Sequence, residues 1–211
     1  MKRMQICVLG LGKTGKSSLI RSFVEGVFDQ EYVPTIEGGV CKSFSFRNEM
    51  IRLSINDTAG SKEFNHLVPD TIKQSNAFII VYSLDDRESF DSIQYYKDLI
   101  NQYKTISMPA IILVANKTDL PEELHQISKF EREQISKYYQ APYVESSSTN
   151  SQSLYNIFIA LLEENETKNK IRIIKKKEYE RRIKILNQNG IIFKMLHKMK
   201  ILNTTNEILK I

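Results

Sequence analysis

The residues with the clearest chemical potential lie between Asp57 and Ser61, a segment that reads Asp-Thr-Ala-Gly-Ser at the end of a predicted strand. A carboxylate such as Asp57 can hold a Mg²⁺-bound water, and the backbone of Gly60 can come close enough to donate to a terminal phosphate. The next position is where a hydrolytic enzyme would place a side chain that orients the attacking water. Serine is too short for that task, so the segment predicts a nucleotide switch whose own hydrolysis is slow.

A glycine-rich loop that can hold phosphates runs from Gly10 to Ser17 and matches the pattern G-x-x-x-x-G-K-[ST]. It follows a short apolar run and precedes a helix-like stretch, so its N–H groups and the helix N-terminus can wrap the phosphates. Lys16 would reach the β- and γ-phosphates, and the Ser17 hydroxyl would ligate Mg²⁺. We expect nucleotide contacts from these residues of the segment: Gly10, Gly12, Lys13, Thr14, Gly15, Lys16, Ser17 and Ser18.

A second motif, Asn116-Lys117-Thr118-Asp119, follows an apolar run and indicates which base is bound. A carboxylate at Asp119 can accept from both N1–H and the exocyclic amine of guanine. Adenine lacks that pair of donors and would leave the carboxylate unsatisfied. The aliphatic stem of Lys117 can cover the base, and Asn116 would tie this loop to the phosphate loop.

The elements that must position these motifs alternate between strand and helix patterns. Apolar runs predict buried strands, and periodic apolar residues predict helices. Strands separated by helical crossovers indicate an open α/β sheet that binds ligands at the carboxyl ends of its strands. The expected strands are residues 4–10, 40–46, 51–57, 77–84 and 110–116, and the expected helices begin at Lys16 or cover 88–104, 128–140 and 154–162.

With these motifs in order, residues 4–166 resemble a Ras-type small GTPase of the Ras and Rap branch. The resemblance implies an α/β P-loop G domain with a mostly parallel six-stranded sheet, helices on both faces, and GTP or GDP with Mg²⁺ as ligands. It further implies that Thr35 binds Mg²⁺ and senses the γ-phosphate, that Tyr32 closes over it, and that Phe28 lies against guanine. The expected catalytic residues are then Lys16, Thr35, Gly60 and Ser61, and the Mg²⁺ ligands are Ser17, Thr35 and Asp57.

The chain departs from the family pattern at the last base motif and in the effector segment. Ser147, Ser148 and Thr149 stand where the family usually has Ser-Ala-Lys, and the Ser148 N–H can still donate to guanine O6. Gly38 and Gly39 replace the usual continuation of the effector segment. We therefore expect residues 32–40 to bind an altered set of effector proteins, alongside an exchange factor and a GTPase-activating protein as further partners.

Ser61 and Lys13 each leave two interpretations open. Loss of the water-orienting side chain costs on the order of 10–100-fold in rate, or about 1.4–2.7 kcal/mol of barrier. The chain is then a slow GTPase rescued by a partner that inserts its own Asn or Gln, as in the Rap branch, or a nearly constitutive GTP-bound scaffold. Lys13 is either solvated or perturbs phosphate contacts or nucleotide exchange.

A P-loop kinase is a further class of protein that carries a glycine-rich phosphate loop. Such a kinase would have no reason to carry both the Asp57–Gly60 segment and the Asn116–Asp119 motif.

The charge distribution divides the 211 residues into an acidic body and a basic tail. Residues 167–211 hold 13 Lys and Arg against 3 acids, whereas residues 1–166 hold 17 against 22. The sequence thus predicts a G domain over 1–166 and a basic, partly helical extension over 167–211. Two cysteines, no long apolar span and no visible signal peptide predict a cytoplasmic protein.

The tail carries no cysteine for a prenylated C-terminus, and Lys2 excludes N-myristoylation, so no lipid anchor motif is expected. Three interpretations compete for it. It is a solvated extension, a basic amphipathic helix that lies peripherally on an anionic membrane, or a helix for a partner protein or nucleic acid. The lack of interleaved aromatic residues argues against specific nucleic-acid binding.

Overall fold

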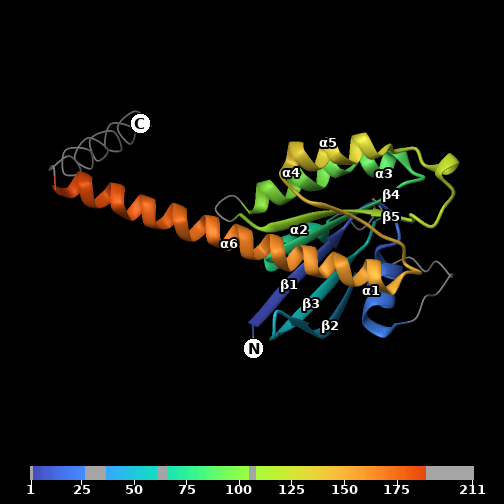
Figure 1. Ribbon diagram of the computed structural model, residues 1–211, viewed down its shortest axis with the longest axis horizontal. Helices are drawn as coiled ribbons and strands as arrows, with labels where there is room; N and C mark the ends of the chain where they lie inside the picture. The colour runs from blue at the N-terminus through green and yellow to red at the C-terminus, as the bar shows by residue number, and fades with distance from the viewer. Residues whose placement is uncertain (1, 27–36, 61–65, 105–107, 189–211) are drawn as a thin grey trace, which may run out of the picture. The chain divides into compact units, whose positions relative to one another are not determined.

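The computed structural model describes residues 2–26, 37–60, 66–104 and 108–188. Six strands form one sheet in the order β2-β3-β1-β4-β5-β6 (Figure 1). All neighbouring strands are parallel except β2 and β3, which form an antiparallel hairpin. The α/β fold with a mostly parallel six-stranded sheet is therefore confirmed. The strands are β1 Lys2–Leu9, β2 Glu37–Phe46, β3 Glu49–Thr58, β4 Ala77–Ser83, β5 Ala110–Asn116 and β6 Tyr143–Glu145.

Helices cover both faces of the sheet because the central strands are apolar on both sides. Every residue of β4 and β5 is buried. Apolar residues of α1 and α6 pack with those of one sheet face, and residues of α2, α3 and α4 pack with those of the other. The helices are α1 Lys16–Glu25, α2 Val68–Gln74, α3 Arg87–Asp91, α4 Ile93–Tyr103, α5 Lys129–Tyr139 and α6 Ser151–Gln188, with a short 3₁₀ turn at Glu122–Leu124.

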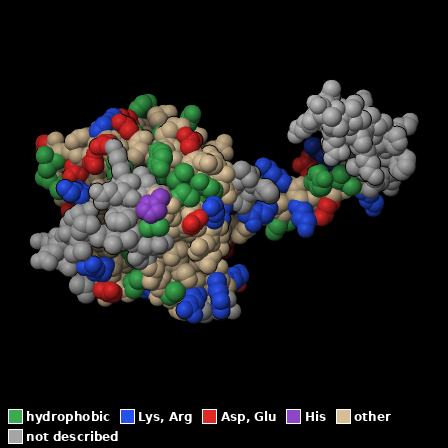
Figure 2. Space-filling model, turned by 180° about the vertical axis from the view of Figure 1, so that it is seen from behind, with side chains coloured by type: hydrophobic (Ala, Val, Ile, Leu, Met, Phe, Trp, Pro, Cys, Tyr) green, Lys and Arg blue, Asp and Glu red, His purple; other side chains and the backbone are tan. Residues whose placement is uncertain are grey.

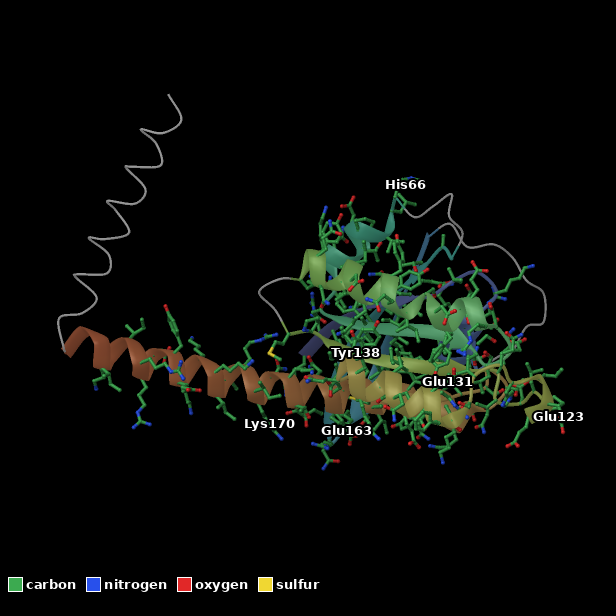
Figure 3. All side chains as sticks on the ribbon, turned by 90° about the horizontal axis from the view of Figure 1, so that it is seen from above. His66, Glu123, Glu131, Tyr138, Glu163 and Lys170 are labelled. Carbon is green, nitrogen blue, oxygen red and sulfur yellow. The ribbon has the colours of Figure 1, made fainter. Side chains whose placement is uncertain are left out.

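Local sequence accounts for where several elements begin and turn. The β2–β3 hairpin turns at Arg47 and Asn48, which both have positive φ, as tight hairpin turns require. Helix α5 begins at a capping box in which Ser128 and Glu131 bond each other's backbone N–H groups. Glu131 and Tyr138 both project from this helix (Figure 3).

By its contacts the chain divides into two units, Met1–Lys168 and Asn169–Ile211. Helix α6 extends from Ser151 to Gln188, so it covers the helix expected over 154–162 and continues into the segment expected to be partly helical. The domain assignment made from sequence, with its break after residue 166, stays a prediction. Among the described residues, no helix is long and apolar enough to span a membrane.

Candidate nucleotide-binding site

The phosphate loop is a strained turn between β1 and α1. Gly10 has φ +143°, and a Cβ there would lie 2.2 Å from the carbonyl oxygen of Val81. Gly15 has φ +93° and caps α1 without a side-chain hydrogen bond. Glycine is required at both positions, and the first N–H groups of α1 have no side-chain cap. The loop therefore offers donors of the kind that bind phosphate.

Side chains of the loop are folded back on its own backbone. The Thr14 hydroxyl and the Lys16 ammonium both donate to the carbonyl of Leu11, at 2.9 and 2.8 Å. Lys16 is only 5% exposed. Burial lowers its pKa to about 8, against the opposing effect of the Asp57 charge. A buried ammonium group has lost its hydration by water, and an anionic ligand would replace that lost stabilisation. The position of Lys16 therefore favours an anionic ligand.

Oxygen atoms suited to Mg²⁺ meet at the start of α1. The Ser17 hydroxyl donates to Oδ2 of Asp57 at 2.5 Å, which brings a hydroxyl and a carboxylate together beside the loop. Hard oxygen donors of this kind fit Mg²⁺. The third expected ligand, Thr35, lies outside the described residues. Within the described ranges, no group of three or more His, Cys, Asp and Glu side chains could hold a metal.

Gly60 brings the segment after β3 onto the phosphate loop. The Gly12 N–H donates to the Gly60 carbonyl at 2.9 Å. A Cβ on Gly60 would lie 2.3 Å from the Gly12 nitrogen and 2.6 Å from Nζ of Lys16. Only glycine fits this approach. Ser61, the residue expected to set the hydrolysis rate, lies outside the described residues, as do Phe28 and Tyr32.

The loop after β5 is bonded to the phosphate loop. Asn116 donates from its side-chain amide to the carbonyl of Thr14 at 2.8 Å. A Cβ on Gly15 would lie 2.2 Å from that amide nitrogen and 3.7 Å from Oγ of Ser148. Asn116, Gly15 and Ser148 thus come together, although they are far apart in the sequence.

The remaining base-motif residues lie around this junction. Lys117 has φ +66° and forms an ion pair with Asp85, with both N–O distances 3.2 Å. Asp119 is exposed at the same turn. Ser147 is buried, and its hydroxyl lies 2.7 Å from that of Thr149. The Thr118 N–H donates to Ser146 and joins the two loops.

Two expected phosphate contacts are exposed to different degrees. Lys13 is exposed at φ +64°, and Ser18 is half-buried on α1.

Sequence reasoning missed two residues that hold the base loops. Asp85 pairs with Lys117, and the Ser153 hydroxyl both accepts from the Ser147 N–H and donates to the Ser147 carbonyl, at 3.2 and 3.1 Å. The position of Asp85 just after the buried strand β4 was an available signal, since ligand sites gather at such strand ends. Ser153 gave no signal, because its role depends on how α6 docks.

The fold and the three joined loops define a P-loop nucleotide-binding domain. The Ras family model matches residues 5–167, so this chain belongs to the Ras family. The chain is similar to the Ras-like protein rasC of Dictyostelium discoideum, with 31% identity over 77% of this chain and 86% of the relative. It is also similar to the Ras-like protein RAS2 of Hydra vulgaris, with 32% identity over 88% of this chain and 97% of the relative. With the Ras-like protein rasX of Dictyostelium discoideum it shares 29% identity over 98% of this chain and 95% of the relative.

Membership of this family makes the chain a small GTPase, a GTP-binding switch of signal transduction. Effectors, exchange factors and GTPase-activating proteins are the kinds of partner that the family implies.

Proposed function

We propose that this chain is a guanine-nucleotide switch that binds GTP and GDP with Mg²⁺ and hydrolyses GTP slowly. One observation carries the proposal. Three loops after β1, β3 and β5 are joined by the Gly12–Gly60 and Asn116–Thr14 hydrogen bonds and by the Ser17–Asp57 contact. These loops supply phosphate donors, hard oxygen ligands and a base-binding carboxylate at one edge of the sheet.

Each group has a distinct task in this mechanism. Lys16 and the loop N–H groups hold the phosphates and stabilise charge that develops on them during transfer. Ser17, Thr35 and Asp57 would hold Mg²⁺, and the bound ion would supply positive charge beside the phosphates. The Gly60 backbone, so close to Gly12 and Lys16, would sense whether a terminal phosphate is present.

Guanine selectivity would come from the loops after β5 and β6. Asp119 accepts from the base, the Ser148 N–H donates to O6, and Lys117 covers the ring. Thermal denaturation with GDP or ADP tests this assignment. At a thousand-fold excess over its dissociation constant, GDP should add about 4 kcal/mol of stability. ADP should add almost none, and equal stabilisation by both nucleotides would contradict the assignment.

Slow hydrolysis is proposed from Ser61, which is too short to orient water. Single-turnover GTP hydrolysis by the wild type and by Ser61→Gln measures this directly. We expect the Gln variant to be about 10–100-fold faster. A wild-type rate equal to that of Ser61→Gln would refute the role of Ser61. If neither protein hydrolyses GTP, the alternative of a constitutive GTP-bound scaffold is favoured.

Control of the switch would lie with partners. Because β2 is an edge strand, the backbone of residues 37–40 can pair with an effector, while residues 32–36 of the proposed effector segment lie outside the described residues. A GTPase-activating partner would supply the Asn or Gln that Ser61 does not. The basic tail would hold the protein on an anionic membrane.

A further inference from the structure

A polar cavity on the sheet lies apart from the nucleotide loops, and two arginines line it. Its volume is about 340 Å³. It lies near the amino end of β1, whereas the nucleotide loops follow the carboxyl ends of the strands. The lining residues are Arg3 and Gln5 of β1, Arg52 and Ser54 of β3, and Asn76 just before β4.

The register of the sheet places the two arginines side by side. Arg3 pairs with Arg52, and Gln5 pairs with Ser54, in the parallel β1–β3 ladder. Paired residues of neighbouring strands project from the same face with backbones about 4.8 Å apart. Both guanidinium groups can therefore reach one ligand. Figure 2 shows Lys and Arg side chains gathered at the lower end of the body, where β1, β2 and β3 lie in Figure 1.

The two positive charges have no acidic partner in the part of the chain that the structure describes. None of the five lining residues is acidic. The Arg3 side chain makes no ion pair or hydrogen bond with the described residues, although its backbone belongs to the β1–β3 ladder. Arg52 interacts with Cys41, where hydrogen bonds from Ser54 and Arg52 lower the pKa of the exposed thiol. Two neighbouring cations without a counter-charge repel each other, and an anion between them would relieve that repulsion.

Neutral groups around the arginines can also donate. The Gln5 N–H donates to Oδ1 of Asn76 at 3.1 Å, and the Asn76 N–H donates to the Gln5 carbonyl at 2.9 Å. Because Oδ1 is already used, the NH₂ group of Asn76 remains able to donate. The Ser54 hydroxyl lies 3.4 Å from Sγ of Cys41 at the cavity edge. This donor set suits an anion with several acceptor oxygens and more than one charge.

We propose that Arg3 and Arg52 form a second anion site, separate from the nucleotide site, that binds a phosphate monoester group. Gln5, Ser54 and Asn76 supply the neutral hydrogen bonds. The register pairs Ser54 with Cys41 of β2, so the bound group lies beside the strand in which the proposed effector segment ends. The phosphate belongs either to a small phosphorylated compound or to a phosphorylated side chain of a partner protein.

The Cys41 thiol provides a local probe of this site. Cys41 is exposed and Cys7 is buried, so iodoacetamide should label Cys41 selectively in the folded protein. The protein is kept with GDP and Mg²⁺ so that phosphate does not compete for the nucleotide loop. A phosphate that binds Arg52 would draw its guanidinium group away from Cys41 and so reduce the fraction of Cys41 present as thiolate. Because the thiolate is the form that reacts, alkylation of Cys41 should slow by at least about threefold. Sodium chloride at equal ionic strength should leave the rate nearly unchanged.

Arg3→Gln separates binding from screening, because the pKa of Cys41 is lowered by Ser54 and Arg52, which this variant keeps. This variant should be alkylated at the wild-type rate without phosphate and should lose the protection. Lys137→Gln, an exposed change on α5, is the matched control and should keep it. Equal slowing by sodium chloride, or undiminished protection of Arg3→Gln, would overturn the proposal.

Two further arms identify the source of the phosphate. A phosphoserine peptide that protects Cys41 at lower concentration than inorganic phosphate, while its unphosphorylated form does not, would identify a partner protein. Protection by inorganic phosphate that the peptide does not surpass would identify a small phosphorylated compound. Either result supports the site, and absence of protection by both refutes it. Because the readout requires no hydrolysis, this test can fail while the switch function holds.

Discussion

At the scale of single residues, substitution of two glycines that both have positive φ can distinguish the effect of backbone strain from that of a steric collision. Gly15 and Gly26 have φ of +93° and +74°. A Cβ on Gly15 would lie 2.2 Å from the Asn116 amide, whereas none of the described atoms lies within 4 Å of a Cβ on Gly26. Gly15→Ala must displace Asn116 or the loop, and we expect GDP affinity to fall about 100-fold by fluorescent-nucleotide titration.

Gly26→Ala is the matched control, because it adds the same left-handed strain without the collision. It should lower the free energy of unfolding by about 1 kcal/mol and leave GDP affinity unchanged. Equal loss of affinity in both variants would mean that strain, rather than contact with Asn116, explains the need for glycine at Gly15.

A second residue-scale prediction concerns Asp85, which holds Lys117 in the base loop. Burial raises the pKa of Asp85, but bonds from Ser83 and Lys117 outweigh that effect and lower it, so the Asp85 carboxyl is ionised at neutral pH. Asp85→Asn should speed GDP release by about threefold to tenfold, or roughly 0.7–1.4 kcal/mol. Glu49→Gln, which breaks the Lys2–Glu49 pair far from the site, should not change release. Stopped-flow displacement of fluorescent GDP compares the variants.

At the scale of elements, most of the fold could be predicted from local patterns, and the exceptions have physical causes. The apolar runs that became β4 and β5 and the helix beginning at Lys16 needed no tertiary information. Helix α6 covers both the helix expected over 154–162 and the first part of the extension expected to be partly helical, where Lys, Arg and Glu favour helix. Strand β6 is three residues long and only partly buried, so it had almost no sequence signal. The motif loops could be located, but the Asp85–Lys117 pair depends on long-range docking.

The capping box of α5 gives a prediction at this scale. Glu131 accepts from the backbone N–H and hydroxyl of Ser128, at 2.9 and 2.7 Å, and also pairs with Arg87. Ser128→Ala should lower the free energy of unfolding by about 1 kcal/mol at neutral pH, measured by urea denaturation. Gln134→Ala, at an exposed position within the same helix, should cost almost nothing.

The pH dependence of that loss is fixed by Glu131. The bonds from Ser128 lower the pKa of this carboxyl below its ordinary 4.5. The contribution of the ionised Glu131 carboxylate to the free energy of unfolding is therefore complete above the unfolded-state pKa. It disappears as the pH falls through the lower folded-state pKa. The difference between wild type and Ser128→Ala should shrink below about pH 4. A difference that grows on acidification would contradict this linkage.

At the scale of the whole molecule, charge separates the chain into parts with different surfaces. The helical segment 169–188 carries eight Lys and Arg against two Glu, and its Ile173, Ile174 and Tyr179 side chains are exposed. Two of the cations pair locally, Arg182 with Glu178 and Lys176 with Glu180. Ile173 and Ile174 are consecutive and so lie about 100° apart around the helix, which places them on different faces. Membrane attraction by this segment would therefore depend mainly on charge.

We expect the full chain to float with vesicles rich in phosphatidylserine and to detach in high salt, where the Debye length falls to about 3 Å. Each basic residue near such a surface contributes about 1 kcal/mol, so Lys170→Glu with Lys177→Glu should weaken binding at least about tenfold. Lys129→Glu with Lys137→Glu makes the same charge change on α5 and should have a much smaller effect. Similar losses in both pairs would mean that net charge, rather than the tail, governs adsorption. Binding that persists in neutral vesicles would assign it to the exposed apolar side chains.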